Sequence, residues 1–316
     1  MAEPLSKRLL FVTGKGGVGK STVAAALGML AARQGRRTIV AEVAGRDDVA
    51  RALGDGASPG HAGERQLAER LWTISVDPQA AMEEYLADQL PLRAFADVLG
   101  SSRTFSYFAA ATPGLRELLC VGKLWELAQP ARRTPGASGY DLCVVDAPAT
   151  GHGLALLRAP QTFAEVARVG PIARHARTIS QTLTNSEVTG VIAVARAAEI
   201  PVTETLLLQR ELRARLGIEL DALIVNAVAP HRFAPREIEA LTAASEDDRR
   251  ADHASRHAAL RAALGEHVRE RGERAQLRRL RRSSGIAPIK LAALLGTASI
   301  GVTKCRALAD ELESQF

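Results

Sequence analysis

The sequence predicts an α/β protein with a doubly wound, mostly parallel sheet flanked by helices and carrying helical insertions. Three observations predict this fold. Short apolar segments alternate with helical ones, most of them are apolar on both faces, and the first leads into a glycine-rich loop and an apolar helix. Strands that are apolar on both faces are typical of a sheet covered by helices on each side. The 47% apolar content of the 316 residues is sufficient for a large core.

Six strands are expected in order along the chain, at residues 9–13, 38–43, 71–76, 142–146, 191–195 and 222–228. Helical segments are expected at about 79–140 and 153–187. A long charged helix is expected at about 235–283, and it ends in a run of arginines. Basic residues suit the C-terminal end of a helix, because the helix dipole is negative there.

A glycine-rich loop, here called the phosphate loop, directly follows the first expected strand. The spacing from Gly14 to Ser21 fits G-x-x-x-x-G-K-[ST], in which backbone N–H groups surround nucleotide phosphates. The helix that follows would direct its positive end at the anion. We expect Lys20 to reach the β- and γ-phosphates and Ser21 to ligate Mg²⁺. The predicted nucleotide-binding residues of this loop are Gly14, Lys15, Gly16, Gly17, Val18, Gly19, Lys20, Ser21 and Thr22.

An aspartate ends the fourth expected strand. Asp146 opens the segment D-A-P-A-T-G-H, which runs to His152. A carboxylate at the carboxyl edge of a parallel strand, beside the phosphate loop, is placed to hold Mg²⁺ through its bound water. The sequence therefore predicts Ser21 and Asp146 as the metal-binding residues, with Lys20 and Asp146 as catalytic groups.

Lys15 has no structural role that the loop itself would require. The pattern K-G-G-V-G-K-S-T resembles the deviant Walker A motif of the dimeric P-loop ATPases, which include the MinD/ParA group, the nitrogenase iron protein and the ArsA/tail-anchored-protein targeting group. In those families this lysine reaches the phosphates held by the partner subunit. The resemblance implies that Lys15 is also catalytic and that two subunits close around ATP.

Further segments narrow the resemblance to one family. D-x-P-x-T-G-H resembles switch II of the ArsA arsenite-pump ATPase and of its relatives that escort tail-anchored membrane proteins. Residues 113–117, 201–205 and 223–226 also resemble that family, and the last segment implies that Asn226 contacts adenine. The resemblance covers most of residues 8–230. Since only one phosphate loop occurs, we expect residues 1–316 to form a single ATPase domain.

The resemblance implies a dimeric, Mg²⁺- and ATP-dependent ATPase that couples ATP binding and hydrolysis to a client or partner. The dimer would contain two copies of this chain or one copy and a paralogue. A hydrophobic protein client fits this family. The apolar stretches 105–128 and 154–183 would either line a client groove or pack on the sheet, and the sequence leaves both alternatives open.

One departure from the family concerns switch I. There an aspartate after the second strand orients the attacking water, and the best alignment places Ala44 at its position. Glu42, Asp47 and Asp48 are nearby substitutes. The replacement predicts ordinary nucleotide affinity with slow hydrolysis. It also leaves open a weakly hydrolysing, nucleotide-gated binding subunit that works beside an active paralogue.

Composition limits the other functions. The net charge of +6 could attract nucleic acid or an anionic membrane, but charges of both signs along the helices favour solvated surfaces. A MinD/ParA-like positioning ATPase remains an alternative that the T-G-H segment opposes. Cys120, Cys143 and Cys305 lie too far apart in the sequence to indicate a zinc or metalloid site. No apolar run approaches the length of a membrane span, and the N-terminus enters the first strand directly, so we expect a cytoplasmic protein without an integral membrane segment.

Overall fold

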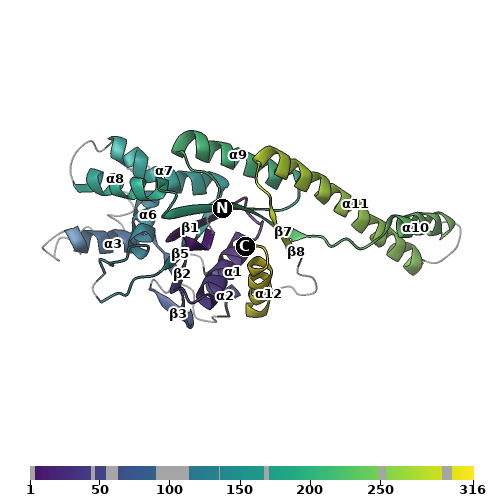
Figure 1. Ribbon diagram of the computed structural model, residues 1–316, viewed down its shortest axis with the longest axis horizontal. Helices are drawn as coiled ribbons and strands as arrows, with labels where there is room; N and C mark the ends of the chain where they lie inside the picture. The colour runs from purple at the N-terminus through teal and green to yellow at the C-terminus, as the bar shows by residue number, and fades with distance from the viewer. Residues whose placement is uncertain are drawn as a thin grey trace.

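The computed structural model describes residues 4–43, 47–54, 63–89, 114–134, 136–166, 171–248, 254–293 and 301–316. Its strands form one eight-stranded sheet in the order β3-β4-β2-β5-β1-β6-β7-β8 (Figure 1). They are β1 (Leu9–Gly14), β2 (Thr38–Val43), β3 (Arg65–Ala68), β4 (Leu71–Val76), β5 (Leu142–Ala149), β6 (Thr189–Ala195), β7 (Ala222–Val228) and β8 (Ile289–Ala292). All neighbouring strands run parallel except β3 and β4.

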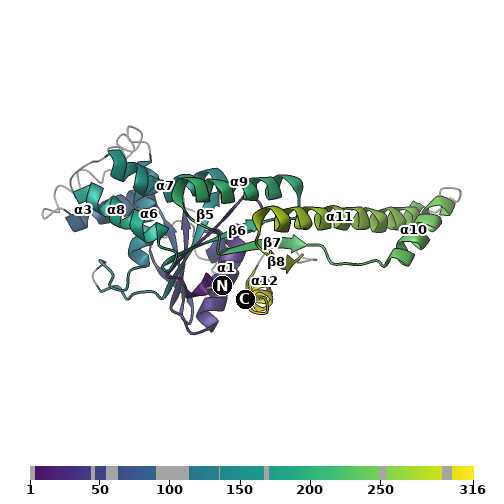
Figure 2. The same ribbon diagram turned by 45° about the horizontal axis from the view of Figure 1, so that its top comes forward.

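Helices cover both faces of the sheet, which confirms the predicted α/β class. One face carries α1 (Lys20–Arg33), α2 (Asp48–Ala52) and α12 (Val302–Glu313). The opposite face carries α6 (Leu115–Leu127), α7 (Thr150–Val166), α8 (Pro171–Thr184) and α9 (Glu199–Leu216), as Figure 2 shows. α3 (Pro78–Gln89) packs against α6. Along β1, Leu10 and Val12 belong to the α1 side of the core, and Leu9 and Phe11 to the other.

All six predicted strands occur, and three of them extend beyond the predicted ends. The sequence analysis did not predict the two edge strands, β3 and β8. Both have only four residues. β3 alternates half-buried and exposed positions, and in β8 only Leu291 is buried. Edge strands of this kind lack the continuous apolar run by which the central strands were recognised.

The helical segment expected at 79–140 is shorter than predicted. α3 and α6 lie within it, but α6 ends at Leu127 and the described residues from 128 to 141 are not helical. Residues 90–113 lie outside the described part of the chain. Pro130 lacks a backbone N–H, and Gly136 has a φ of 75°, in the left-handed region. The helical expectation for 128–140 was therefore wrong.

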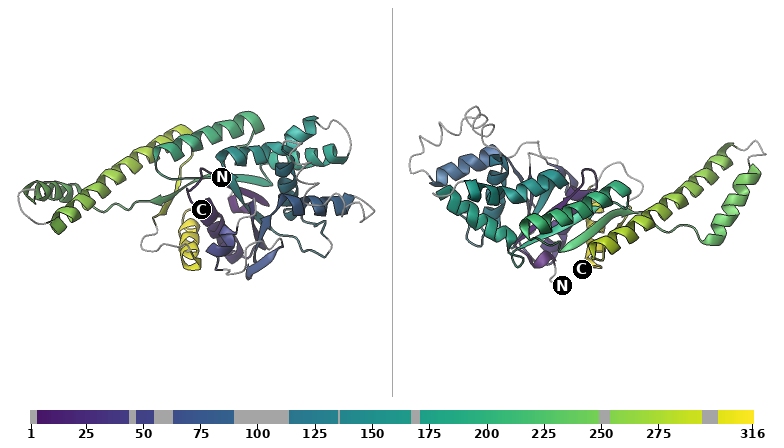
Figure 3. Two further views of the ribbon diagram at one scale, coloured as in Figure 1. Left: turned by 180° about the vertical axis from the view of Figure 1, so that it is seen from behind. Right: turned by 90° about the horizontal axis from the view of Figure 1, so that it is seen from above.

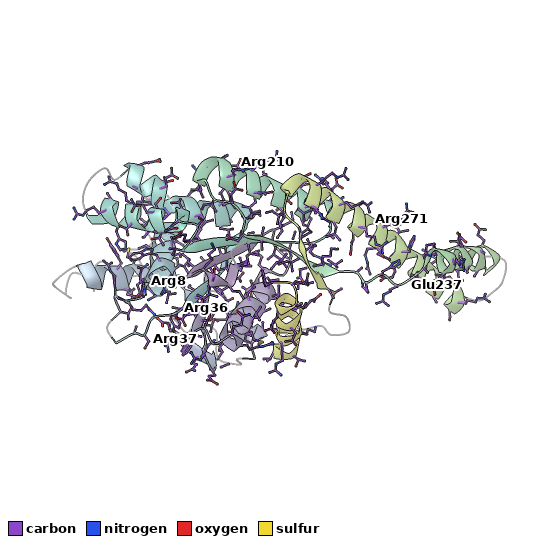
Figure 4. The ribbon with its side chains drawn as sticks, in the orientation of Figure 1. Arg8, Arg36, Arg37, Arg210, Glu237 and Arg271 are labelled. Carbon is purple, nitrogen blue, oxygen red and sulfur yellow. The ribbon has the colours of Figure 1, made fainter. Side chains whose placement is uncertain are left out.

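Arginine side chains hold this non-helical segment at the amino edge of the sheet. Arg8 donates from Nε to Ala128 O at 2.9 Å and from Nη2 to Tyr140 O at 3.0 Å. Arg36 donates from Nη2 to Asp141 O, and Figure 4 labels both arginines on this side of the molecule. Part of the basic charge of the chain thus satisfies backbone carbonyls.

The charged helix expected at 235–283 is two helices. α10 (Pro235–Asp248) and α11 (Ala254–Ser284) pack side by side as an arm that projects away from the sheet (Figures 1 and 3). Glu237 and Arg271 mark the two helices in Figure 4. The exposed Glu246, in the last turn of α10, is unfavourable beside the negative end of the helix dipole. Leu280, near the end of α11, anchors the arm in the core.

The second helical segment, expected at 153–187, begins three residues earlier than predicted and contains two helices, α7 and α8. Thr150, Gly151 and His152 form the first turn of α7. Within the described ranges, no helix is both long enough and apolar enough to span a bilayer.

Candidate functional site

The phosphate loop joins β1 to α1 and is shaped by glycines. Gly14 has a φ of 147°, and a Cβ there would lie 2.1 Å from the carbonyl oxygen of Val194 in β6. Gly19 has a φ of 93°, and a Cβ there would lie 2.2 Å from Asn226 Nδ2. Both contacts are far shorter than a Cβ tolerates, so only glycine fits without movement. The backbone can therefore fold tightly enough to present its N–H groups to an anion.

Lys20 lies directly over this loop. It is the first residue of α1 and is only 7% exposed. Its Nζ donates to the Lys15 carbonyl oxygen at 3.2 Å. Ser21 follows in the first turn of α1, where backbone N–H groups have no partner within the helix. Gly16 and Gly17 form the exposed outer part of the loop. This arrangement is suited to phosphate groups that enter from solvent.

Asn226 supports the loop from the end of β7. Its Nδ2 donates to the Val18 carbonyl oxygen at 2.9 Å. The next residue, Ala227, has a φ of 56°, a conformation that a residue with a Cβ rarely adopts. Asn226 was expected to contact adenine, and the structure places its amide nitrogen on the backbone of the loop.

Two buried carboxyl groups lie side by side on the face of the sheet that α1 covers. Asp146 of β5 is the register partner of Glu42 in β2, and the two residues are 5% and 1% exposed. Burial raises the pKa of Glu42 to about 7, and the nearby charge of Asp146 acts in the same direction. Hydrogen bonds from the backbone N–H groups of Val49 and Asp48, at the start of α2, partly offset this rise in the pKa of Glu42.

The donor set fits a hard divalent cation. Ser21 and Asp146 supply a hydroxyl and a carboxylate, and Mg²⁺ prefers oxygen ligands of these types. Among the residues that the structure describes, the buried atoms Thr13 Oγ1 and Glu42 Oε1 make no hydrogen bond. Buried polar atoms are normally satisfied, so ligand or water oxygens are the expected partners. Ser21 and Asp146 could therefore hold a hydrated Mg²⁺ beside the phosphate loop.

Lys15 contacts a carboxylate of its own chain. Its Nζ forms an ion pair with Glu204 Oε1 on α9, and Thr150 Oγ1 donates to Glu204 Oε2 at 3.3 Å. The sequence analysis noted Glu204 only as part of the segment 201–205. A carboxylate in the first turns of the helix after β6 was the signal available, but only the fold shows that it faces Lys15.

Ala44, at the expected switch I position, belongs to residues 44–46, which lie outside the described ranges. Its flanks are described. β2 ends at Val43, and Asp48, the first residue of α2, pairs with Arg51 on the surface. Of the three proposed substitutes, Glu42 is the one that lies buried beside Asp146.

A cavity of about 380 Å³ lies along α7, from Gly151 to Phe163. Its lining includes Gly114, Gly151, Leu154, Arg158, Ala159 and Phe163. Other apolar residues of the stretch 154–183, such as Leu157 and Ile179, are buried in the core. The stretch therefore both packs on the sheet and lines a cavity. Residues 105–113 of the other stretch lie outside the described part.

The cysteines are buried and form no disulfide. Burial raises the pKa of the Cys120 thiol to about 12 and that of Cys305 to about 11. Burial also raises the pKa of the Cys143 thiol. Thiols of this kind are poor nucleophiles and poor metal ligands at neutral pH.

Comparison with known proteins places the chain beside a family of ATPases. The family model of the ArsA anion-transporting ATPases matches residues 7–169. ATPase BagA of Mycobacterium tuberculosis is 32% identical over 234 residues, which are 73% of this chain and 68% of that protein. ATPase GET3 of Chaetomium globosum is 29% identical over 161 residues, covering 50% of this chain and 44% of GET3. ATPase ASNA1 homolog 1 of Paramecium tetraurelia is 30% identical over 158 residues, covering 48% of this chain and 43% of the homologue.

Proposed function

The chain belongs to the ArsA family of anion-transporting ATPases. From this we propose that it closes as a dimer around Mg²⁺ and ATP, and that it couples ATP binding and hydrolysis to a protein partner. The observation that carries the proposal is the phosphate loop. Gly14 and Gly19 leave no room for a Cβ, and Lys20 is held above the backbone that they shape. Such a loop has little structural use except to surround an anion.

The residues of the site would divide the task between binding and positioning. The N–H groups of residues 14–22 bind phosphate oxygens, and Lys20 neutralises their charge. Ser21 would hold the metal ion through its hydroxyl group, and Asp146 would hold it through a bound water. Bound Mg²⁺ neutralises negative charge on the phosphate oxygens. The chain itself contributes orientation, because phosphoryl transfer depends mostly on positioning and electrostatics.

Lys15 supports the dimer part of the proposal. Its side chain is one-third exposed and leaves the loop toward Glu204, so it is not needed to shape the loop. A second subunit that approached the loop would meet this ammonium group. The partner would be a second copy of this chain or a paralogue.

The cavity beside α7 supports a hydrophobic client. α7 starts four residues after Asp146, so a change at the phosphates would be transmitted to the helix that lines the cavity. Leu154 and Phe163 provide apolar contact surface there. Purification of the tagged chain with a non-hydrolysable ATP analogue or with ADP, followed by identification of the co-purified proteins by mass spectrometry, tests this part. Partners retained equally in both nucleotide states would contradict the coupling.

Ala44 favours a second candidate, a nucleotide-gated binding subunit that hydrolyses ATP weakly beside an active paralogue. A single-turnover assay on the purified chain separates the two candidates, since ordinary ATP affinity with negligible hydrolysis supports the second.

Sedimentation tests the main proposal. The wild-type chain should be a monomer with ADP and a dimer with Mg²⁺ and a non-hydrolysable ATP analogue. Lys15→Ala should bind the analogue as a monomer with nearly unchanged affinity but should dimerise weakly. Equal dimerisation of Lys15→Ala and the wild-type chain would contradict the role of Lys15. Failure of the wild-type chain to bind the analogue would contradict the site.

A further inference from the structure

One carboxylate connects two segments of the site that are far apart in the sequence. Glu204 accepts from Lys15 of the phosphate loop through Oε1, and from Thr150 at the start of α7 through Oε2, the latter at 3.3 Å. Thr150 follows Asp146 by four residues, at the end of β5. Both oxygens of Glu204 are thus engaged by residues next to the proposed phosphate and metal positions.

The helix that carries Glu204 is fixed in place. Val202 and Leu208 of α9 are buried in the core beneath it. On its outer side, Arg279 of α11 donates to Thr203 Oγ1 at 3.0 Å, and Gln209 Nε2 donates to Ser284 O at 3.0 Å. Glu204 therefore stands on a rigid support, whereas Lys15 stands in a loop between glycines. Of the two partners, Lys15 is the one that can move.

The contact competes with the crossing of Lys15 to a second subunit. An ammonium group that donates to Glu204 of its own chain is not at the phosphates of a partner. From this geometry we propose that Glu204 is a positioning residue that holds Lys15 on its own subunit until the dimer closes. The inference rests on the proposed function in which Lys15 crosses. Because Thr150 shares the same carboxylate, release of Lys15 and rearrangement of switch II are linked.

The strength of the contact suits a reversible hold. The Lys15 and Glu204 side chains are 34% and 32% exposed, and ion pairs at this exposure are weak enough to open. The several negative charges of a triphosphate outweigh the single charge of Glu204 as a partner for the ammonium group. Nucleotide and a second subunit together would therefore release Lys15.

Glu204→Gln tests the hold. Glutamine keeps an oxygen that can accept from Thr150 but removes the charge that attracts Lys15. With Mg²⁺ and a non-hydrolysable ATP analogue, the dimer dissociation constant of this variant should fall by up to about fivefold, the range that a partly exposed ion pair allows. Glu211→Gln is the matched control, since Glu211 lies two turns further along α9 and pairs with Arg215 instead. An unchanged or weaker dimer in Glu204→Gln would overturn the proposal.

A double variant shows whether the effect passes through Lys15. The gain from Glu204→Gln should disappear in a Lys15→Ala background, because no ammonium group remains to be held. If the gain persists there, Glu204 acts by another route and the proposal is wrong.

Amine labelling measures the hold without any dimer. N-hydroxysuccinimide acetate should acetylate Lys15 about two- to fivefold faster in monomeric Glu204→Gln than in the wild-type chain, as peptide mass spectrometry would show, because the ion pair that protects the amine is lost. Equal labelling would overturn the contact itself. Faster labelling of the variant, with a wild-type chain that stays monomeric in the ATP analogue, would instead overturn the proposed dimer and leave the contact standing.

Discussion

Glu42 and Asp146 are register partners on the parallel strands β2 and β5, and both are buried on the face of the sheet that α1 covers. Two adjacent carboxyl groups that are shielded from solvent cannot both ionise without a high free-energy cost, because desolvation and repulsion between the two charges disfavour it. Burial and the nearby charge of Asp146 accordingly raise the pKa of Glu42 from 4.5 to about 7. The pair makes the metal-free chain sensitive to pH.

Glu42→Gln should change the pH dependence of stability in EDTA. Between pH 4.5 and about 7 the unfolded chain releases the Glu42 proton and the folded chain keeps it, so wild-type stability falls as pH rises through this window. The glutamine variant has no such proton. It should match the wild-type chain near pH 4.5 and exceed it at pH 8 by up to roughly 3 kcal/mol in the free energy of unfolding. Urea unfolding at both pH values measures this, and parallel curves for the two proteins would contradict it.

Gly19→Ala should destabilise the nucleotide-free chain by about 2–3 kcal/mol, since a left-handed alanine costs about 1–2 kcal/mol and the Asn226 hydrogen bond about 1 kcal/mol more. Gly16→Ala is the control within the same loop, because a Cβ there would meet no atom within 4 Å. In an Asn226→Ala background the added cost of Gly19→Ala should shrink, since the clash with Nδ2 is gone. Thermal unfolding of the wild-type chain, the three single variants and the double variant tests this. Equal costs in both backgrounds would show that Asn226 does not restrict Gly19.

Lys20→Met should weaken ATP binding about 10- to 100-fold, because a hydrogen bond to a charged group contributes about 1.5–3 kcal/mol. Methionine keeps most of the buried apolar stem, so the melting temperature of the nucleotide-free chain should change little. Calorimetric titration with Mg²⁺ and ATP measures the affinity. Wild-type affinity in this variant would show that the phosphates bind elsewhere.

Ala44→Asp should raise turnover at least about tenfold with little change in ATP affinity, because an oriented attacking water contributes substantially to the rate of phosphoryl transfer. The wild-type chain alone should hydrolyse ATP slowly. Glu42→Gln, Asp47→Asn and Asp48→Asn, tested individually, would reveal a carboxylate that already performs this task. Brisk wild-type turnover with no gain from Ala44→Asp would refute the impaired switch.

The central sheet and the phosphate loop could be predicted from the sequence because both depend on local patterns. A strand buried between two helical layers is mostly apolar on both faces, as β2 and β4 are, and both were predicted with correct bounds. Gly14, Lys20 and Ser21 lie within one short segment, so their spacing alone indicates phosphate chemistry. The charges of 235–283 are equally visible, but whether they form one helix or two depends on the packing of α10 on α11.

Relations between distant segments were decided by the tertiary structure. Glu42 and Asp146 are neighbours only because the strand order places β5 beside β2, and in that position they are only 1% and 5% exposed. Glu204 meets Lys15 only because α9 crosses the sheet next to β1, and Asn226 reaches Val18 only because β7 follows β6 in the sheet. A sequence states which groups a chain carries and how they are spaced locally. Their pKa values and partners depend on the burial and proximity that the whole fold creates.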